Sequence, residues 1–205
     1  MSSQYHLYEL EVAQNRSHPA HILPPPSAPS ERVLDIGCGA GQTLIAAYPD
    51  RISFGIDIDI EALKLGSSLT TEVFFTCGRA ELLPYAGEQF DLVVSRIALP
   101  YTNIEASLKE IRRVLRPGGR LWITLFPFSY EWNSAKARHS VRKLFFVYVL
   151  VNSLSFHLFQ KQFSVFGRHE SFQTERGIVR ALRRTGFGQI SITRNRHFLV
   201  TALAV

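Results

Sequence analysis

Between residues 32 and 126, the chain alternates short apolar runs with segments of helical periodicity. The apolar runs, rich in β-branched and aromatic residues, lie at 32–37, 51–57, 73–78, 90–95 and 120–126. Helices are predicted between them at 41–48, 60–67, roughly 80–83 and 103–116. Nearly continuous apolar strands that alternate with helices are typical of a parallel sheet covered on both faces. The pattern therefore predicts an α/β fold built on five parallel strands.

The C-terminal end departs from this alternation. The stretch TERGIVRALRRTGF, at 174–187, predicts an amphipathic helix that ends at Gly186. Two strand-like runs, FGQISITR and HFLVTALAV, follow on either side of Asn195 and Arg196. Strands joined by so short a turn must be antiparallel. We therefore expect a seven-stranded, mostly parallel sheet that closes with an antiparallel hairpin.

Two segments lie outside the strand–helix alternation. Residues 1–31 contain the helically spaced stretch YHLYELEVAQ and then a proline-rich stretch typical of a polyproline II connector. We interpret them as an N-terminal arm and linker that precede a domain at 32–205. Residues 127–168 are too long for an ordinary connection, and we expect a helical cap insertion there.

Composition is that of an ordinary globular protein of one domain, with 205 residues, 46% hydrophobic and 20% charged. The N-terminus has no signal-peptide pattern. The longest apolar stretch, at 144–151, is far short of the ~20 residues that span a bilayer. A cytoplasmic location is therefore expected. Cys38 and Cys77 are the only cysteines, and no Cys/His spacing indicates zinc, so we predict no metal site.

The net charge of +6 permits an acidic partner such as nucleic acid. The arginines of the predicted helices at 103–116 and 174–187 oppose apolar residues, as on the solvated face of an amphipathic helix. A platform for RNA would interleave aromatic side chains with them, and that pattern is absent from the sequence. Nucleic acid is therefore the less favoured partner.

The turn after the first predicted strand is rich in glycine. Residues 32–43 read RVLDIGCGAGQT, with Gly37, Gly39 and Gly41 at every second position. A dinucleotide fingerprint would need glycine at 42, where the chain has Gln, and no Walker lysine follows. Asp35, at the end of the same strand, would be unfavourable beside a pyrophosphate.

An acidic group near this turn instead suits a ligand with a positive charge. Asp57, at the end of the second strand, lies about 20 residues beyond the first glycine, the spacing at which a carboxylate binds ribose hydroxyls. Both strand ends lie where open α/β sheets bind ligands. The expected ligand is a nucleoside with a cationic tail and no phosphate, which describes S-adenosylmethionine.

Four stretches in order resemble the class I S-adenosylmethionine-dependent methyltransferases of the quinone-biosynthesis type, also described as methyltransferase type 11. They are VLDIGCGAG (33–41), GIDID (55–59), GRAELLPYAGEQFDLVVS (78–95) and LKEIRRVLRPGGRLWIT (108–124). The resemblance covers roughly 31–126 together with the terminal helix and hairpin. It implies a Rossmann-like fold and methyl transfer from S-adenosylmethionine.

The resemblance also implies roles for particular residues. Asp35 would hold the methionine ammonium, largely through water or backbone, and the glycines would pass close to the methionine. Asp57 would accept from the ribose hydroxyls, Ile58 would pack on adenine, and Ser95 would lie by the sulfonium. The predicted cofactor-binding residues are Asp35, Gly37, Cys38, Gly39, Gly41, Asp57, Ile58, Arg79, Ala80, Glu81 and Ser95.

Arg79 departs from the family pattern, which commonly has an acidic residue bonded to the adenine amino group. Arg79 could stack on adenine, pair with Asp57 or Glu81, or mark an altered cofactor site. No catalytic residue is identified. His18, His21, His139 and His157 are each weak candidates for a general base.

Acceptor recognition is assigned to the segment after the fourth strand and to the cap. The predicted residues are Tyr101, Phe128, Tyr130 and Trp132. The cap could cover a lipophilic or aromatic acceptor, contact a membrane surface through its basic and apolar residues, or pack on itself or on a twin subunit. Our hypothesis is a monomeric or homodimeric methyltransferase for a small lipophilic or aromatic acceptor. A tRNA or rRNA methyltransferase and a non-catalytic binding protein are the alternatives.

Overall fold

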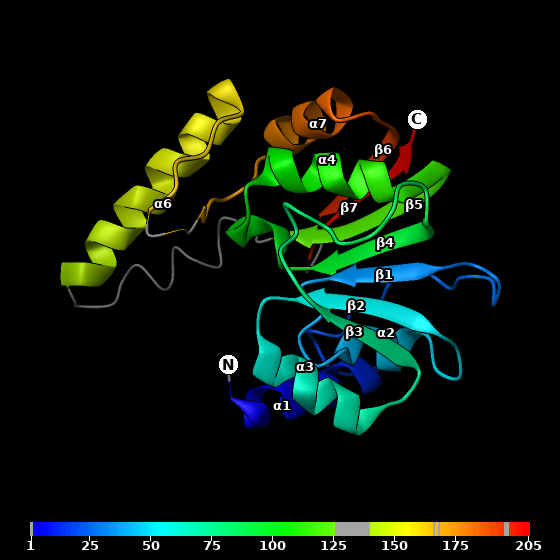
Figure 1. Cartoon of the computed structure of the whole chain (residues 1–205). Helices are drawn as coiled ribbons and strands as arrows, with labels where there is room; N and C mark the ends of the chain where they lie inside the picture. The colour runs from blue at the N-terminus through cyan, green and yellow to red at the C-terminus, as the bar shows by residue number, and fades with distance from the viewer. Residues whose placement is uncertain (1, 126–139, 166, 168, 195–196) are drawn as a thin grey trace.

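The computed structural model describes residues 2–125, 140–165, 167, 169–194 and 197–205, with the backbone alone described at 140–143. Within them, seven strands form one sheet in the order β3-β2-β1-β4-β5-β7-β6 (Figure 1). The strands are β1 (Val33–Ile36), β2 (Ser53–Asp57), β3 (Val73–Cys77), β4 (Phe90–Arg96), β5 (Leu115–Leu125), β6 (Phe187–Arg194) and β7 (Phe198–Ala204). The first five are parallel, and β7 runs antiparallel to both β5 and β6. The predicted fold class is confirmed.

Helices cover both faces of this sheet. They are α1 (Ser3–Gln14), α2 (Gln42–Ala47), α3 (Ile60–Leu69), the 3₁₀ helix η1 (Leu99–Tyr101), α4 (Ile104–Val114), α6 (Ser140–Phe159) and α7 (Glu175–Arg184). Figure 1 shows α4 and α7 above the sheet, with α1, α2 and α3 below it. Side-chain caps begin α3, α4 and α7 at Asp59, Asn103 and Thr174.

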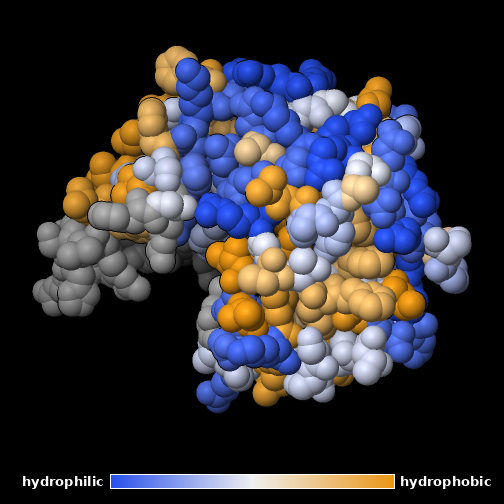
Figure 2. All heavy atoms as spheres, viewed as in Figure 1, coloured by the Kyte–Doolittle hydropathy of each residue, from blue (hydrophilic) through white to orange (hydrophobic). Residues whose placement is uncertain are grey.

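The cap insertion lies apart from these two layers. Helix α6 projects from the side of the sheet where the parallel strands end, and hydrophobic side chains gather over it (Figures 1 and 2). It contacts the body through α7 and through backbone bonds near η1, where the Ser171 N–H donates to the Pro100 carbonyl at 3.1 Å. The predicted cap is therefore helical. Among the described residues, no helix is long and apolar enough to cross a membrane.

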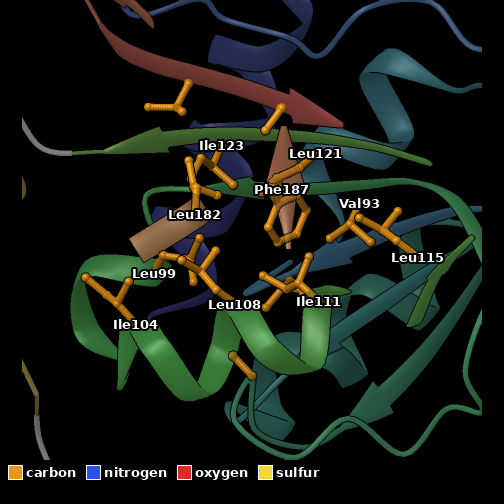
Figure 3. Close-up of a cluster of buried hydrophobic side chains, with 14 of the residues drawn as sticks. Val93, Leu99, Ile104, Leu108, Ile111, Leu115, Leu121, Ile123, Leu182 and Phe187 are labelled. Carbon is orange, nitrogen blue, oxygen red and sulfur yellow. The ribbon is translucent and has the colours of Figure 1, made fainter. Parts of the chain in front are cut away.

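The core follows the two-residue period of the central strands. In β4, Val93 faces the α4 and α7 layer, whereas Leu92 and Val94 lie in the cluster around α2. A register shift between Phe90 and Leu92 interrupts the alternation and puts Phe90 on the same side as Val93. Figure 3 shows Leu108 and Ile111 of α4 pointing at the strands. All of these side chains are almost fully buried. Both faces of the sheet are thus covered by packed side chains. This leaves the ends of the strands as the place where a ligand can bind.

Two expectations about local structure are wrong. The helix predicted at roughly 80–83 is absent, and these residues form a turn closed by a bridge between Arg79 and Leu82. Its geometry depends on a distant partner, because the Leu83 N–H donates to the Glu110 carboxylate at 2.9 Å. Strand β5 begins at Leu115 rather than at 120, since Leu115 pairs with Phe90 across the sheet.

The N-terminal arm packs on the body. Helix α1 contacts α2 and α3, and Val12 and Ala13 are buried. Along the proline-rich stretch, the Pro25 carbonyl accepts from the Tyr48 hydroxyl at 3.0 Å, and Glu31 pairs with Arg120 at 2.7 Å. The boundary at residue 31 stays a prediction.

Candidate functional site

The glycine turn lies where the strand order reverses, because β1 sits between β2 and β4. Gly37, Gly39 and Gly41 have φ of +73°, +56° and +79°, values that residues with a Cβ rarely adopt. The N–H groups of Gly37 and Cys38 both donate to the Ile56 carbonyl, at 2.8 and 3.1 Å. The turn is therefore held against the end of β2.

A close approach also fixes Gly37. A Cβ added there would lie 2.1 Å from the Ala98 Cβ, in the segment that follows β4. The preceding residue, Ile97, has φ of +62°, a strained value for a β-branched side chain. The ends of β1 and β4 are thus pressed together beside the glycine turn.

The Asp57 carboxylate joins the ends of β1 and β2. One oxygen accepts from the Gly39 N–H at 2.8 Å and the other from the Asp59 N–H at 2.9 Å. Each carboxylate oxygen has two lone pairs, so acceptor capacity remains for ligand hydroxyls. The following residue, Ile58, leaves 73% of its surface exposed. A polar acceptor and an exposed apolar side chain thus adjoin in the chain at this strand end.

Asp35 is buried beneath the turn, with 1% of its surface exposed. In the part of the chain that the structure describes, its Oδ1 has no hydrogen-bond partner. Burial raises the pKa of the Asp35 carboxyl to about 7, against the opposing field of Arg96. A cationic group near this carboxylate would stabilise its charged form.

The predicted adenine edge contains an ion pair. Arg79 lies 3.6 Å from Glu81, which also accepts from the Asn103 N–H at 2.9 Å, and Ala80 between them is buried. Of the options open in the sequence, the structure has Arg79 paired with Glu81. Leu82, which sequence reasoning missed, is 77% exposed at this edge. In the sequence, the feature that could have indicated Leu82 is an apolar residue directly after the acidic Glu81.

Ser95 and Cys38 are both packed inside the strand ends. The buried Ser95 hydroxyl donates to the Ile36 carbonyl at 2.9 Å, so it ties β4 to β1. Burial raises the pKa of the Cys38 thiol, which keeps it protonated and unreactive. A Cβ added at Gly55 would lie 2.7 Å from the Cys38 sulfur. The side chains of Ser95 and Cys38 thus support the turn.

Helix α1 adds a residue that sequence reasoning overlooked. His6 is buried, its Nδ1 lies 2.9 Å from Gln42 Nε2, and its ring would be 3.2 Å from a Cβ added at Gly39. Burial lowers the pKa of His6, which favours the neutral ring. Among described residues, its Nε2 has no hydrogen-bond partner. Nearby, Glu9 pairs with Arg96 at 2.6 Å.

The histidines weighed from the sequence lie elsewhere. His18 contacts the Tyr8 hydroxyl, His21 contacts the Val12 carbonyl, and His157 contacts Thr174. His139 lies outside the described residues. In the sequence, the feature that could have indicated His6 is its position three residues before Glu9. This spacing puts both side chains on one face of a helix.

Tyr101 borders a small cavity between η1 and the cap. Phe145 and Val149 of α6 line the same cavity, as do Ser171 and Phe172. Tyr101 is 48% exposed. The other predicted acceptor residues, Phe128, Tyr130 and Trp132, lie outside the described residues. In the described ranges, no group of three His, Cys, Asp or Glu residues is placed to hold a metal.

Comparison with known proteins defines the class of this site. Residues 34–123 match a family model described as a methyltransferase domain. One solved structure, a methyltransferase from Thermotoga maritima titled a possible histamine N-methyltransferase, has a TM-score of 0.63 and 17% identity, covering 97% of this chain and 89% of its own. Residues 34–123 thus match a methyltransferase domain, and the solved structure shares the fold of the described residues. The resemblance seen in the sequence is confirmed.

Curated relatives match about half of the chain. A malonyl-[acyl-carrier protein] O-methyltransferase from Methylococcus capsulatus is 35% identical over 113 residues, which are 52% of this chain and 40% of that protein. A demethylmenaquinone methyltransferase from Renibacterium salmoninarum is 33% identical over 103 residues, 49% of this chain and 43% of that protein. The chain thus matches less than half the length of these relatives.

The close contact at Gly37 predicts a large effect of one methyl group. Gly37→Ala should lower the free energy of unfolding by about 2–5 kcal/mol, because overpacking adds to backbone strain. Gly118→Ala is the matched control, with φ of +74° and no heavy atom within 4 Å of the added Cβ. Gly118→Ala should lower the free energy of unfolding only by the cost of the backbone strain, about 1–2 kcal/mol. Equal losses of stability in urea denaturation would contradict the close approach.

The buried Asp35 carboxyl predicts a pH dependence of stability. Its folded pKa of about 7 exceeds the ordinary value of 3.8, so the folded chain binds an extra proton between them. This group therefore destabilises the fold as pH rises from about 4 to about 7. We compare the free energy of unfolding of Asp35→Asn with that of wild type at two pH values. The difference should shift in favour of Asp35→Asn between pH 4 and pH 8, by as much as about 4 kcal/mol. Glu72→Gln, at an exposed carboxyl, is the control. A pH-independent difference between Asp35→Asn and wild type would refute the shift.

Proposed function

We propose that this chain transfers a methyl group from S-adenosylmethionine to a small lipophilic or aromatic acceptor. The observation that carries the proposal is the Asp57 carboxylate, bonded to the Gly39 N–H at 2.8 Å beside the exposed Ile58. It lies within a methyltransferase domain, at the strand ends where open α/β sheets bind ligands. The curated relatives support the reaction type by their names.

The residues at the turn fit the proposed cofactor. Asp35 Oδ1 and His6 Nε2 are buried polar atoms that lack partners among the described residues, and such atoms are costly unless a ligand or water bonds them. Ile58 and Leu82, 73% and 77% exposed, provide apolar surface for a flat ring.

In this proposal, the chain binds and orients the donor. Asp57 would accept from the ribose hydroxyls while its bond to Gly39 keeps the turn in place. Asp35 would stabilise the ammonium charge through water or backbone, with its own charge favoured in return. When bound, S-adenosylmethionine supplies a methyl group already activated on a sulfonium. Arg79 and Glu81 would border the adenine as an ion pair, because they pair in the structure.

Alignment can account for most of the rate in such a transfer. Holding an acceptor and an activated group in line contributes about 7–11 kcal/mol to lowering a barrier. Tyr101 is 48% exposed in the segment after β4, beside Phe145 and Val149 of α6, and would contact an aromatic or apolar acceptor. The relatives named for malonyl-[acyl-carrier protein] and demethylmenaquinone support small-molecule acceptors.

RNA is the less supported acceptor, because much of the basic charge on α4 and at the start of β5 is already engaged within the chain. Arg112 donates to the carbonyls of Gly186 and Val205, Arg113 pairs with Glu110, and Arg116 pairs with Asp91. Guanidinium groups engaged in this way contribute less to a phosphate-binding platform. Strong binding of tRNA that weakens steeply with salt would favour the RNA alternative.

Calorimetric titration of S-adenosylmethionine tests the donor site. Asp57→Ala should weaken binding about 10- to 100-fold, since hydrogen bonds to charged groups contribute about 1.5–3 kcal/mol. Glu72→Ala is the matched control and should bind as wild type does. The absence of binding by the wild-type chain would end the enzyme hypothesis.

An acceptor screen with radiolabelled donor tests the second half of the proposal. Quinol, phenol and acyl-thioester acceptors should take up label, and Tyr101→Ala should raise KM more than it lowers kcat. Transcribed tRNA serves as the competing acceptor. Tight binding of donor with no labelled product from any acceptor would favour a non-catalytic binding protein.

A further inference from the structure

Helix α6 exposes an apolar stripe along its whole length. Five residues spaced three or four apart lie on one side, and 50–73% of each is exposed. They are Leu144, Val147, Val151, Leu154 and Leu158. Phe159 and Phe163 extend the stripe, with 67% and 56% of their surfaces exposed. Figure 2 shows hydrophobic side chains gathered over this helix. A patch so large and continuous is typical of an interaction surface.

The opposite side of α6 combines apolar and polar contacts with the body. Val149 and Phe156 are buried there, and Phe156 belongs to the main hydrophobic core. Asn152 is fully buried, and its Nδ2 donates to the Glu170 carbonyl at 2.9 Å while its Oδ1 accepts from the Phe163 N–H at 2.7 Å. Because this packed and hydrogen-bonded side fixes the orientation of the helix, the apolar stripe on the other side faces outward.

The segment that contains α6 is basic in sequence, and Glu170, whose carbonyl accepts from Asn152, lies on the body side of the helix. Between Glu131 and Glu170 the chain contains no Asp or Glu. Its charged residues in that interval are Lys136, Arg138, Arg142, Lys143, Lys161 and Arg168. Arg142 and Lys143 lie in the first turn of α6, and Lys161 follows its last turn. An apolar stripe with basic residues at both ends is complementary to a surface that is apolar beneath and negatively charged above.

We propose that α6 is a peripheral membrane anchor whose apolar stripe inserts into the surface of a bilayer containing anionic phospholipid. The helix combines an exposed apolar stripe with basic residues in its first turn and just after its last, which is how an interfacial helix binds anionic lipid. A second copy fits less well. Antiparallel pairing of two α6 helices would bring the basic end of one to the basic end of the other.

The position of α6 connects this surface with the candidate site. The helix projects where the parallel strands end (Figure 1), and its residues Phe145 and Val149 line the cavity that Tyr101 borders. Gln162, just after α6, accepts from the Ile104 N–H at 2.8 Å and donates to the Thr102 carbonyl at 3.2 Å. The cavity thus lies on the body side of α6, and the stripe lies on the outer side of the same helix.

Co-sedimentation with vesicles, without donor or acceptor, tests the proposal independently of methyl transfer. Wild-type chain should bind phosphatidylcholine vesicles that contain phosphatidylglycerol, and bind pure phosphatidylcholine vesicles about tenfold more weakly. Val151→Asp/Leu154→Asp should weaken binding to the mixed vesicles about tenfold or more. Ile52→Asp/Val205→Asp adds the same charge at residues 57% and 77% exposed, away from α6, and should bind as wild type does.

Two further measurements separate the alternatives. Arg142→Gln/Lys143→Gln/Lys161→Gln should lose the preference for anionic vesicles while retaining titration of S-adenosylmethionine. Sedimentation velocity without vesicles should give one and the same state for wild type and Val151→Asp/Leu154→Asp. Equal vesicle binding by the stripe and control variants would overturn the proposal. A dimer that the stripe substitutions dissociate, with no vesicle binding, would also overturn it and assign the stripe to a second copy.

Discussion

The Asp57 carboxylate provides the interaction on which the candidate site depends. It accepts one N–H from the turn after β1 and one from the segment after β2, so a single side chain joins two neighbouring strand ends. Both bonds are made to a charged acceptor, which makes them stronger than ordinary backbone bonds. Gly39 can take part because it lacks a Cβ and adopts φ of +56°. Bonds within the chain therefore hold the glycine turn and the Asp57 carboxylate in place by themselves.

Several energetically unfavourable features lie around the glycine turn. Asp35 is buried without a full set of partners, His6 places an unpartnered nitrogen beside Gly39, and Ile97 is held at a strained φ. Buried polar groups and strained residues of this kind concentrate at functional sites. In the proposed function, a cationic donor would offset the cost at Asp35. The Glu9–Arg96 pair holds α1, and with it His6, over the same place.

The cap makes the proposed acceptor chemistry and the proposed membrane contact parts of one arrangement. One side of α6 is hydrogen-bonded to the body through Asn152, and its outer side is an apolar stripe. The end of α6 bonds the segment after η1 through Gln162. The same helix therefore borders the cavity at Tyr101 on its inner side and presents the proposed membrane contact on its outer side.

The sequence by itself determined the features that depend on neighbours in the chain. Strand and helix periodicity, the positive φ of the glycine turn, and the placement of Asp57 after an apolar strand all follow from local pattern. Tertiary structure decided the rest. Residues 80–83 formed no helix because the partner of Leu83 is Glu110, and His6 reached the site because Gln42, 36 residues away, bonds it. The raised pKa of Asp35 depends on burial by the whole fold. The outward face of α6 was likewise undetermined, since helical periodicity is the same for a stripe that faces the core and one that faces outward.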